Sequence, residues 1–250
     1  MRPEVTYFNE ISKSYRAEYD RETPEGYSFR VRRKKVLDMV EGGTAVIDIA
    51  SGPGIMIPGL LKKGCRVTCA DAAPEMIARA RDEYGIIPDV TAVVGDAYAL
   101  PFLDKQFDIA LAMGLIEYLE DEHSFLRETA RVLKDRGELI ITFPNYASPW
   151  RALNRFFLVF VKFIRKLLGK QKRNLITHRE YALKRATSLL ETNGFKVETV
   201  LYYNFKIIPY PLDAWLPRLT VIQSKLFEPL DCTPLRFIGT GLIIKAKKKS

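Results

Sequence analysis

Glycines and carboxylates follow three short apolar stretches of this sequence, at spacings that could form a ligand site. The first stretch ends in DIASGPG, which places Asp48 and Ala50 just before Gly52 and Gly54. Glycine allows a backbone to approach a ligand that a β-carbon would exclude. Asp71 comes after the second stretch and is suited to accept hydrogen bonds from ribose hydroxyls. The spacing therefore points to a tight turn with an acid beside it.

A second acid, Asp96, follows the third stretch in VVGDAYALPF. Acids after two successive strands suit a nucleoside, with one for the ribose and one for a base amino group. A dinucleotide fingerprint is an alternative, but it needs glycine at its sixth position, and counting from Gly52 that position is Ile57, followed by Pro58. A scaffold without any ligand is the other alternative, and the paired acids argue against it.

The acids and glycines belong to a repeating pattern of strands and helices. Apolar runs typical of buried parallel strands occupy residues 44–50, 65–71, 90–96, 107–113 and 137–143. Helical patterns occupy 55–63, 74–84 and 120–134, and towards the end of the chain a helix at 180–193 precedes strands at 195–204 and 241–248. Strands alternating with helices imply right-handed crossovers and a doubly wound α/β sheet. Such sheets bind ligands outside the carboxyl ends of their strands, where the acids lie.

Composition sets wider limits. The 250 residues fit one sizeable domain, and the formal net charge is +9. Cys65, Cys69 and Cys232 form no CxxC pair, and His123 and His178 are the two histidines, so we expect neither a disulfide framework nor a metal site. The charged start of the chain indicates no signal peptide, and no stretch approaches the ~20 apolar residues of a membrane span. We therefore expect a cytoplasmic protein.

Five segments occur in an order and spacing that resemble a known family: VIDIASGPG, VTCADAAPEMIARAR, VVGDAYALPF, FDIALAMGLIEYLED and RVLKDRGELIITFPN. They resemble the motifs of class I S-adenosylmethionine-dependent methyltransferases, and are most similar to the methyltransferase type 11 group, which includes the ubiquinone and menaquinone methyltransferases. The resemblance covers about Val36 to Asn145. It implies a Rossmann-like sheet of seven strands, mostly parallel with an antiparallel C-terminal strand, and S-adenosyl-L-methionine as cofactor.

The resemblance also implies which residues bind the cofactor. The methionine part would lie against Asp48, Ala50, Gly52 and Gly54. The ribose and adenine would lie against Asp71, Ala72, Met76, Asp96 and Ala97, and the sulfonium above Met113 and Gly114. Tyr15 and Tyr19 belong to a loose N-terminal motif that folds over the cofactor in this group. Packing alone remains an alternative for Met76 and the tyrosines. The family usually has glycine in place of Ala50.

The candidate acid–base residues are Glu117, Tyr118 and His178. Methyl transfer from a sulfonium mainly needs alignment, and a base is needed only for a protonated, poorly nucleophilic acceptor. The family often has Glu-His after the fourth strand, so Tyr118 replaces that histidine. Some quinone-pathway relatives bind a divalent metal with a residue at the place of Gly114, so no metal site is expected. For His178 we favour a role in capping or preceding the helix at 180–193.

A basic amphipathic segment follows the fifth strand. Residues 148–174 contain eight Lys or Arg and no acid. A helical wheel groups Arg151, Arg155, Lys162 and Lys166 in one sector. The opposite side holds Trp150, Leu153, Phe156, Phe157, Phe160, Phe163, Ile164 and Leu167. We predict a helix of about 20 residues, roughly 30 Å long, that ends at Gly169.

This composition suits a helix that lies in an anionic membrane interface. A lid over the substrate pocket or an ordinary surface helix are the alternatives. Nucleic acid is not expected as a partner, because the aromatic side chains lie opposite the cations rather than among them. The quinone-pathway relatives have a membrane-contacting insertion in this region, so the resemblance implies a comparable role for the helix Trp150–Lys170.

We therefore expect one methyltransferase domain over residues 1–250. Its parts would be an N-terminal helical cover (1–43), a cofactor-binding core (44–147), the inserted basic helix (148–178), and a C-terminal part (179–250) with a substrate-side cover (205–238). The expected function is methyl transfer to a lipid, quinone or lipid-linked acceptor at the inner face of the membrane. A methyltransferase for a soluble small molecule or sugar, and a non-catalytic protein that binds a membrane or partner, remain the alternatives.

Overall fold

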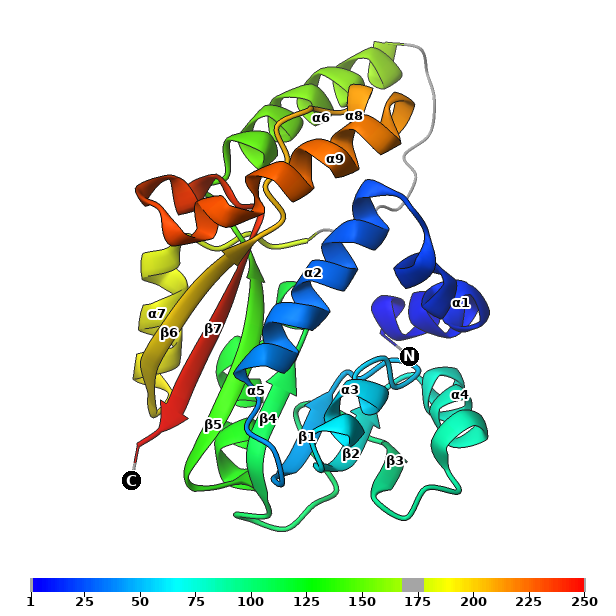
Figure 1. Ribbon diagram of the computed structural model, residues 1–250, viewed down its shortest axis with the longest axis vertical. Helices are drawn as coiled ribbons and strands as arrows, with labels where there is room; N and C mark the ends of the chain where they lie inside the picture. The colour runs from blue at the N-terminus through cyan, green and yellow to red at the C-terminus, as the bar shows by residue number, and fades with distance from the viewer. Residues whose placement is uncertain (1, 168–177, 250) are drawn as a thin grey trace.

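The described strands form one mixed sheet. The computed structural model describes residues 2–167 and 178–249. The strands are β1 (Ala45–Ile49), β2 (Arg66–Asp71), β3 (Val90–Val94), β4 (Phe107–Ala112), β5 (Leu133–Pro144), β6 (Phe195–Tyr203) and β7 (Gly241–Lys248). Their order in the sheet is β3-β2-β1-β4-β5-β7-β6, and β7 pairs antiparallel with both β5 and β6 (Figure 1). The prediction of a mostly parallel, Rossmann-like sheet with an antiparallel C-terminal strand is confirmed.

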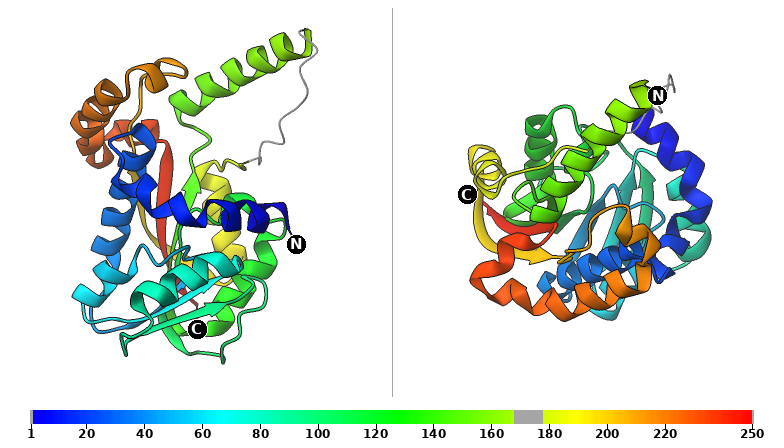
Figure 2. Two further views of the ribbon diagram at one scale, coloured as in Figure 1. Left: turned by 90° about the vertical axis from the view of Figure 1, so that its right-hand side faces the viewer. Right: turned by 90° about the horizontal axis from the view of Figure 1, so that it is seen from above.

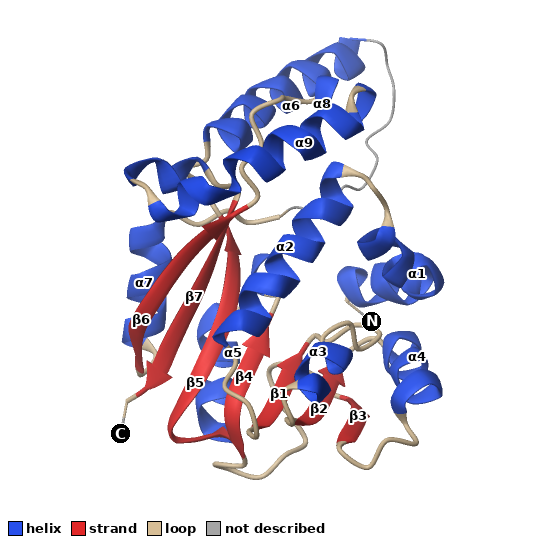
Figure 3. Ribbon diagram, in the orientation of Figure 1, coloured by secondary structure: helices blue, strands red, loops and turns tan. Residues whose placement is uncertain are grey.

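Helices cover both faces of the sheet (Figure 3). The described helices are α1 (Pro3–Asp20), α2 (Pro24–Met39), α3 (Ile57–Lys62), α4 (Pro74–Tyr84), α5 (Glu122–Val132), α6 (Pro149–Leu167), α7 (Leu183–Thr192), α8 (Leu212–Trp215) and α9 (Pro217–Phe227). Short 3₁₀ helices occupy η1 (Ile116–Tyr118), η2 (Glu228–Cys232) and η3 (Pro234–Ile238). Apolar side chains of α2 and α3 pack on one face of the sheet and those of α5 and α7 on the other.

Proline and short polar caps fix where several helices begin. Pro74 opens α4 at its first turn, where the missing N–H has no helical partner to lose. The carboxylate of Asp121 accepts a hydrogen bond from the N–H of Ser124 at 2.9 Å and starts α5. Helix α4 starts where it was predicted, whereas α5 starts at Glu122, two residues after the predicted position 120.

Among the predicted boundaries that were wrong, two concern helices on the same face of the sheet. The helix expected over 120–134 ends at Val132, because Leu133 is fully buried and pairs with Phe107 as the first residue of β5. The helix expected over 180–193 begins only at Leu183. Its expected first residues are used in tertiary contacts instead, since Tyr181 forms a β-bridge with Asn145.

The strand order reverses beside β1, which has β2 on one side and β4 on the other. Ligands of doubly wound sheets bind at such a switch point, outside the carboxyl ends of the strands. Helix α1 lies over this region, and α6, α8 and α9 form a separate layer at the top of the molecule (Figures 1 and 2). We call α6, α8 and α9 the cap.

The turn after β1 contains a strained residue. Ala50 has a φ of 58°, in the left-handed region, and its N–H donates to the carbonyl of Ala70 at 2.7 Å. A β-carbon in this conformation costs roughly 1–2 kcal/mol. The glycine that the family usually has here would be free of that strain.

We therefore expect Ala50→Gly to raise the free energy of unfolding. The relief of strain outweighs the ~0.5–1 kcal/mol entropic cost of glycine, so the net gain is about 0.5–1 kcal/mol, measured by urea denaturation. Ala78→Gly, at an exposed position in the middle of α4 with ordinary helical geometry, is the control and should lose about 1 kcal/mol. Equal losses in both variants would contradict the strain at Ala50.

Candidate functional site

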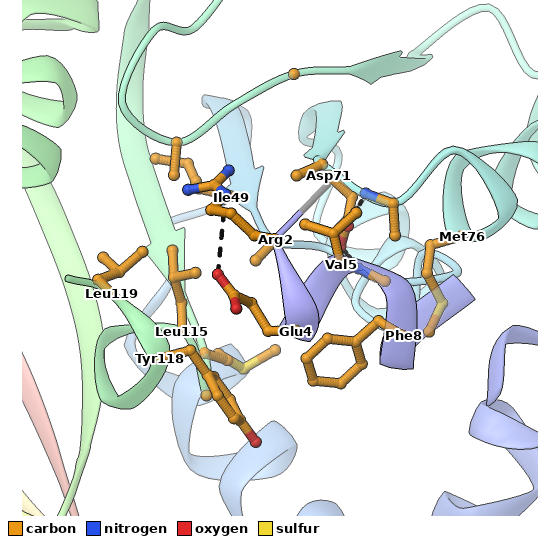
Figure 4. Close-up of a pocket in the computed structure, with 18 of the residues that line it drawn as sticks. Arg2, Glu4, Val5, Phe8, Ile49, Asp71, Met76, Leu115, Tyr118 and Leu119 are labelled. Atoms are coloured by element: carbon orange, nitrogen blue, oxygen red, sulfur yellow. Dashed lines mark hydrogen bonds and ion pairs between the residues drawn. The ribbon is translucent and has the colours of Figure 1, made fainter. Parts of the chain in front are cut away.

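A cavity lies at the switch point, between the carboxyl ends of the strands and α1 (Figure 4). Nine residues predicted to bind the cofactor line it: Tyr15, Ala50, Gly52, Asp71, Ala72, Met76, Ala97, Met113 and Gly114. Arg2, Val5 and Phe8 close it from the side of α1. The structure thus brings together residues from the turns after β1, β2, β3 and β4.

Asp71 organises the floor of this cavity. Its two carboxylate oxygens accept hydrogen bonds from the N–H of Gly52 and from the N–H of Ala73, each at 2.8 Å. Burial raises the pKa of Asp71, while these two hydrogen bonds act in the opposite direction. Each carboxylate oxygen keeps a lone pair after these bonds, so Asp71 can still accept hydrogen bonds from a ligand.

The two glycines of the turn have different roles. Both have a positive φ, 54° at Gly52 and 78° at Gly54. Gly52 lines the cavity, whereas Gly54 does not: a β-carbon on Gly54 would lie 2.4 Å from Cδ1 of Ile57. The structure therefore places Gly54 as a packing residue under the turn, and not at the cofactor surface where the sequence had suggested it.

Asp48 is also placed beneath the cavity rather than in its lining. It is 1% exposed, and its Oδ1 has no hydrogen-bond partner among the described residues. Burial, and secondly the charge of Asp71, raise the pKa of Asp48 to about 8, although Arg32 partly offsets this. A neutral carboxyl at this position can donate a hydrogen bond that a carboxylate could not.

Asp96 and Tyr19, two further predicted cofactor-binding residues, do not line the cavity. Asp96 forms an ion pair with Arg2 at 3.0 Å and is absent from the cavity lining, because the cation at the start of α1 holds its carboxylate at the rim. Tyr19 stacks on Phe29 with ring centroids 4.9 Å apart, and its hydroxyl accepts a hydrogen bond from Arg32 at 3.3 Å. Tyr19 therefore supports a neighbouring side chain.

A second, larger cavity of about 570 Å³ adjoins the first and shares Phe8, Tyr15, Gly114 and Tyr118 with it. All three acid–base candidates, Glu117, Tyr118 and His178, line it. Gly114, at the junction, donates its N–H to Oγ1 of Thr142 at 2.8 Å. A ligand in the second cavity would therefore meet one in the first at Gly114 and Tyr118.

The three acid–base candidates differ in environment. Glu117 is 9% exposed, its Oε2 has no hydrogen-bond partner among the described residues, and burial raises its pKa. Burial, and secondly the charge of Glu117, raise the pKa of the Tyr118 hydroxyl. Burial and the nearby Arg151 lower the pKa of His178, whose ring contacts Tyr118 edge-on at 4.9 Å. The raised pKa makes the buried carboxylate of Glu117 a stronger proton acceptor than an ordinary carboxylate.

His178 was expected to cap or precede the following helix, and the structure shows no capping. The N-cap of α7 is Ala182, without a side-chain hydrogen bond, and His178 contributes to the second cavity instead. Among the described residues no cluster of three or more His, Cys, Asp or Glu is placed to hold a metal ion.

Sequence reasoning missed Arg32, Phe29 and Glu25, which α2 contributes to the second cavity. Arg32 lies in the run RVRRKK, where composition alone cannot tell the buried cation from the exposed ones. The available signal was helical spacing: Phe29, Arg32 and Val36 fall on one face of α2, and that face packs inward.

The first cavity fits S-adenosylmethionine in its chemistry. Ala72, Ala97 and Met76 offer an apolar surface for a base, Asp71 offers acceptors for ribose hydroxyls, and Gly52 allows close approach of the backbone. This fit, with seven strands in the observed order, defines a class I methyltransferase fold.

Comparisons with solved structures agree with that class. A chain of the complex that contains the Haloferax volcanii Trm112 methyltransferase activator superposes with a TM-score of 0.66 at 22% identity, covering 97% of this chain and 98% of its own. A SAM-dependent methyltransferase from Thermotoga maritima gives 0.63 at 19% identity, with the same coverage. These similarities concern the fold.

The sequence comparisons identify the family. Residues 47–141 match the family model described as a methyltransferase domain, Methyltransf_11. The chain therefore carries a class I methyltransferase domain of the type 11 group, whose cofactor is S-adenosylmethionine.

Curated relatives extend the similarity beyond that domain. The demethylmenaquinone methyltransferase of Corynebacterium glutamicum is 30% identical over 64% of this chain and 66% of its own length. The 2-methyl-6-phytyl-1,4-hydroquinone methyltransferase of Arabidopsis thaliana is 34% identical over 48% and 35%. The phosphatidylethanolamine N-methyltransferase of Cereibacter sphaeroides is 29% identical over 63% and 74%. The chain covers less than two thirds of the first two relatives.

The raised pKa of Asp48 predicts a pH dependence of stability. An acid whose pKa is higher in the folded than in the unfolded state contributes most to stability at low pH, and that contribution is lost as pH rises from about 4 to about 8. Asp48→Asn removes this titration, so its free energy of unfolding should fall less than that of the unsubstituted protein between about pH 5 and pH 8. Urea denaturation across this range checks it, with exposed Asp89→Asn as control. Parallel curves for all three proteins would refute it.

Proposed function

We propose that this protein is an S-adenosylmethionine-dependent methyltransferase that acts on a lipid, quinone or lipid-linked acceptor at a membrane surface. The observation that carries the proposal is the pair of adjoining cavities, one with cofactor chemistry and one lined by aromatic residues, which meet at Gly114 and Tyr118. The relatives are named for demethylmenaquinone, a phytyl hydroquinone and phosphatidylethanolamine, which supports a lipid-type acceptor.

Glu117 is the proposed general base, because its buried carboxylate lines the second cavity without a hydrogen-bond partner at Oε2. Tyr118 lies at the junction of the cavities, and His178 packs on its ring. We assign Tyr118 and His178 to the positioning of the acceptor near the methyl group that the cofactor supplies.

Exposed apolar side chains of the cap provide the proposed membrane contact. On α6, Phe156 is 71% exposed and Val159 is 67% exposed. On α8 and α9, Trp215, Ile222 and Leu226 are exposed to a similar degree. Large apolar side chains at this density on one part of a surface are typical of an interaction site. Within the described residues no helix is long and apolar enough to cross a bilayer.

Arg151 and Arg155, at the start of α6, belong to the predicted basic sector, but their side chains face the protein and not the solvent. Arg151 and Arg155 both pair with Glu180, and Arg151 also donates to the carbonyl of Thr240 at 2.7 Å. The guanidinium of Arg155 lies 4.3 Å from the ring centre of Tyr146. These cations therefore dock the start of α6 on the body of the protein, and the apolar side chains of Leu153, Phe156 and Val159 are left exposed.

Trp150 also differs from its predicted place on the lipid-facing side. Its indole N–H donates to the carbonyl of Ile208 at 2.7 Å, and the ammonium of Lys206 lies 4.7 Å from its ring centre. Trp150 thus joins α6 to the segment before α8, and the proposed membrane face begins at Leu153. The side chains of Lys162 and Lys166, and Gly169 and Lys170 with the predicted helix end, lie outside the described residues.

A second candidate is the same enzyme acting on a soluble acceptor, with α6 as a lid. The contacts of Arg151 and Trp150 favour it, because they fix the start of α6 above the second cavity, which Arg151 itself lines. The two candidates differ in whether the exposed apolar side chains of the cap contact lipid. A location at the inner face of the cell membrane belongs to the first candidate only.

Calorimetric titration with S-adenosylhomocysteine, the demethylated form of the cofactor, tests the proposal first. We expect binding that Asp71→Asn weakens at least tenfold, because each lost charge-assisted hydrogen bond contributes ~1.5–3 kcal/mol. Asp108→Asn is a matched control, since its carboxylate also accepts a backbone N–H, that of Ala45 at 2.9 Å, but at the amino end of the sheet. Transfer of labelled methyl groups to a lipid extract then tests for an acceptor. Absence of S-adenosylhomocysteine binding would contradict the proposal of a methyltransferase and favour a non-catalytic protein.

Flotation with liposomes distinguishes the two candidates. We expect the unsubstituted protein to float with anionic vesicles, and Phe156→Glu combined with Leu226→Glu to reduce the bound fraction at least tenfold, because each buried apolar side chain contributes ~1.5–3 kcal/mol. Ile86→Glu is the control: Ile86 is 95% exposed in the loop before β3, at the opposite end of the sheet from the cap. If the protein binds S-adenosylhomocysteine but does not float with the vesicles, the result would favour the second candidate, in which α6 is a lid over the pocket of a soluble acceptor.

A further inference from the structure

Arg32 is a buried cation that no described residue neutralises directly. It comes from α2, lines the second cavity and is 8% exposed, and none of the ion pairs among the described residues includes it. Its Nε has no hydrogen-bond partner there either. A buried charge without a partner is costly, so a structure that retains one commonly uses it for a ligand.

The guanidinium of Arg32 is held in place from several sides. One terminal nitrogen donates to the hydroxyl of Tyr19 at 3.3 Å, and the group lies 5.2 Å from the ring centre of Phe29. Its other terminal nitrogen packs so closely on Gly114 that a β-carbon there would lie at 2.9 Å. Gly114 lines both cavities, so Arg32 lies where a bound acceptor would meet the cofactor.

The other cations and acids of this cavity have partners of their own. Arg151 pairs with Glu180, Glu25 with Lys206 at 3.4 Å, and Glu18 with Arg21. Glu117 is the exception, because its Oε2 has no hydrogen-bond partner among the described residues. The cavity thus presents one cation, Arg32, and one carboxylate, Glu117, that are not paired with each other.

Aromatic rings supply most of the remaining walls. The rings are those of Tyr7, Phe8, Tyr15, Phe29, Tyr118, Phe143 and Tyr203. Rings around a cavity favour a planar, conjugated guest that can pack on them face-on or edge-on. The charges then decide which polar group that guest carries.

We infer that Arg32 and Glu117 form a subsite for an acceptor with an ionisable hydroxyl on a planar conjugated system, a phenol or an enol. The O–H bond breaks, its electron pair stays on the oxygen, and the proton passes to the carboxylate of Glu117. The resulting oxyanion takes Arg32 as its counter-ion, so the buried charge gains the partner that it lacks. This inference rests on the proposed function and selects among its acceptor classes.

The subsite disfavours an amine acceptor. An ammonium group beside Arg32 would place two cations in one buried site, and a neutral amine would leave Arg32 without a counter-ion. An apolar acceptor without a hydroxyl would also leave both charges unpaired. Burial raises the pKa of Glu117, which makes its carboxylate a stronger proton acceptor for a weak acid such as a phenol.

Three matched probes test the subsite without turnover: 4-octyl-2-nitrophenol, its methyl ether and the corresponding aniline. We expect the protein to bind the phenol about 10- to 100-fold more tightly than the ether or the aniline, since a hydrogen bond to a charged group contributes this much. The phenolate absorbs at longer wavelength than the phenol, so absorbance shows whether the bound probe is ionised. We expect its apparent pKa to be lower bound than free.

Arg32→Gln should abolish both the preference for the phenol and the shift in its ionisation, whereas Arg32→Lys, which keeps the charge, should restore part of each. Glu117→Gln should leave the bound phenol ionised at a pH where free phenol is also ionised. At lower pH the unsubstituted protein keeps the phenol's proton on Glu117, so ionisation of the bound phenol in the variant should instead release a proton to the solvent. Arg33→Gln is the control, because Arg33 adjoins Arg32 on α2 but does not line the cavity.

Titration of the same variants with S-adenosylhomocysteine separates this inference from the proposed function. Retained cofactor binding together with equal affinity for phenol, ether and aniline in the unsubstituted protein overturns the subsite and leaves the methyltransferase proposal intact. Absence of cofactor binding overturns the methyltransferase proposal whatever the probes show. A preference for the phenol that survives Arg32→Gln also overturns the role of Arg32.

Discussion

The carboxylate of Asp71 is the interaction on which the site depends most. By accepting the N–H groups of Gly52 and Ala73, it joins the turn after β1 to the turn after β2. Burial, and secondly the charge of Asp71, raise the pKa of Asp48, so the turn after β1 lies between two carboxyl groups in different environments. The positive φ of Ala50 and the absence of a side chain at Gly54 are local consequences of the same tight turn.

The N-terminal helices complete what the sheet begins. Phe8 and Tyr15 of α1 close the cofactor cavity and also line the second one, while α2 inserts Arg32 against Gly114 at the junction. The missing β-carbon of Gly114 thus serves two requirements, a positive φ of 65° and close contact with a guanidinium. The second cavity is therefore lined by helices outside the region that matches the family model together with Gly114, Glu117 and Tyr118, which lie inside that region.

The sequence predicted the sheet well because apolar runs and strand ends are local signals. The strands fall within a few residues of their predicted ranges, and Asp71 lies where the spacing put it. Contacts between segments far apart in the chain could not be predicted from such local signals. The ion pair of Arg2 with Asp96 and the docking of His178 on Tyr118 each join residues far apart in the chain, and no periodicity reports such a pairing. Arg32 was missed for a different reason, because composition alone does not distinguish it from the adjacent cations, although its helical spacing with Phe29 and Val36 does.

Helix α6 shows that a helical wheel can separate cations from apolar residues without telling which of the two sides faces the protein. The wheel separated cations from apolar residues on α6, yet it could not tell that Glu180 would draw Arg151 and Arg155 towards the protein. This orientation changes the balance of forces in the proposed membrane contact. Each apolar side chain buried in lipid contributes ~1.5–3 kcal/mol, against ~1 kcal/mol for each cation near an anionic surface. With two cations already paired, the contact made by the described part of the cap would rest mainly on Phe156, Val159 and the apolar residues of α8 and α9, and would depend only weakly on salt.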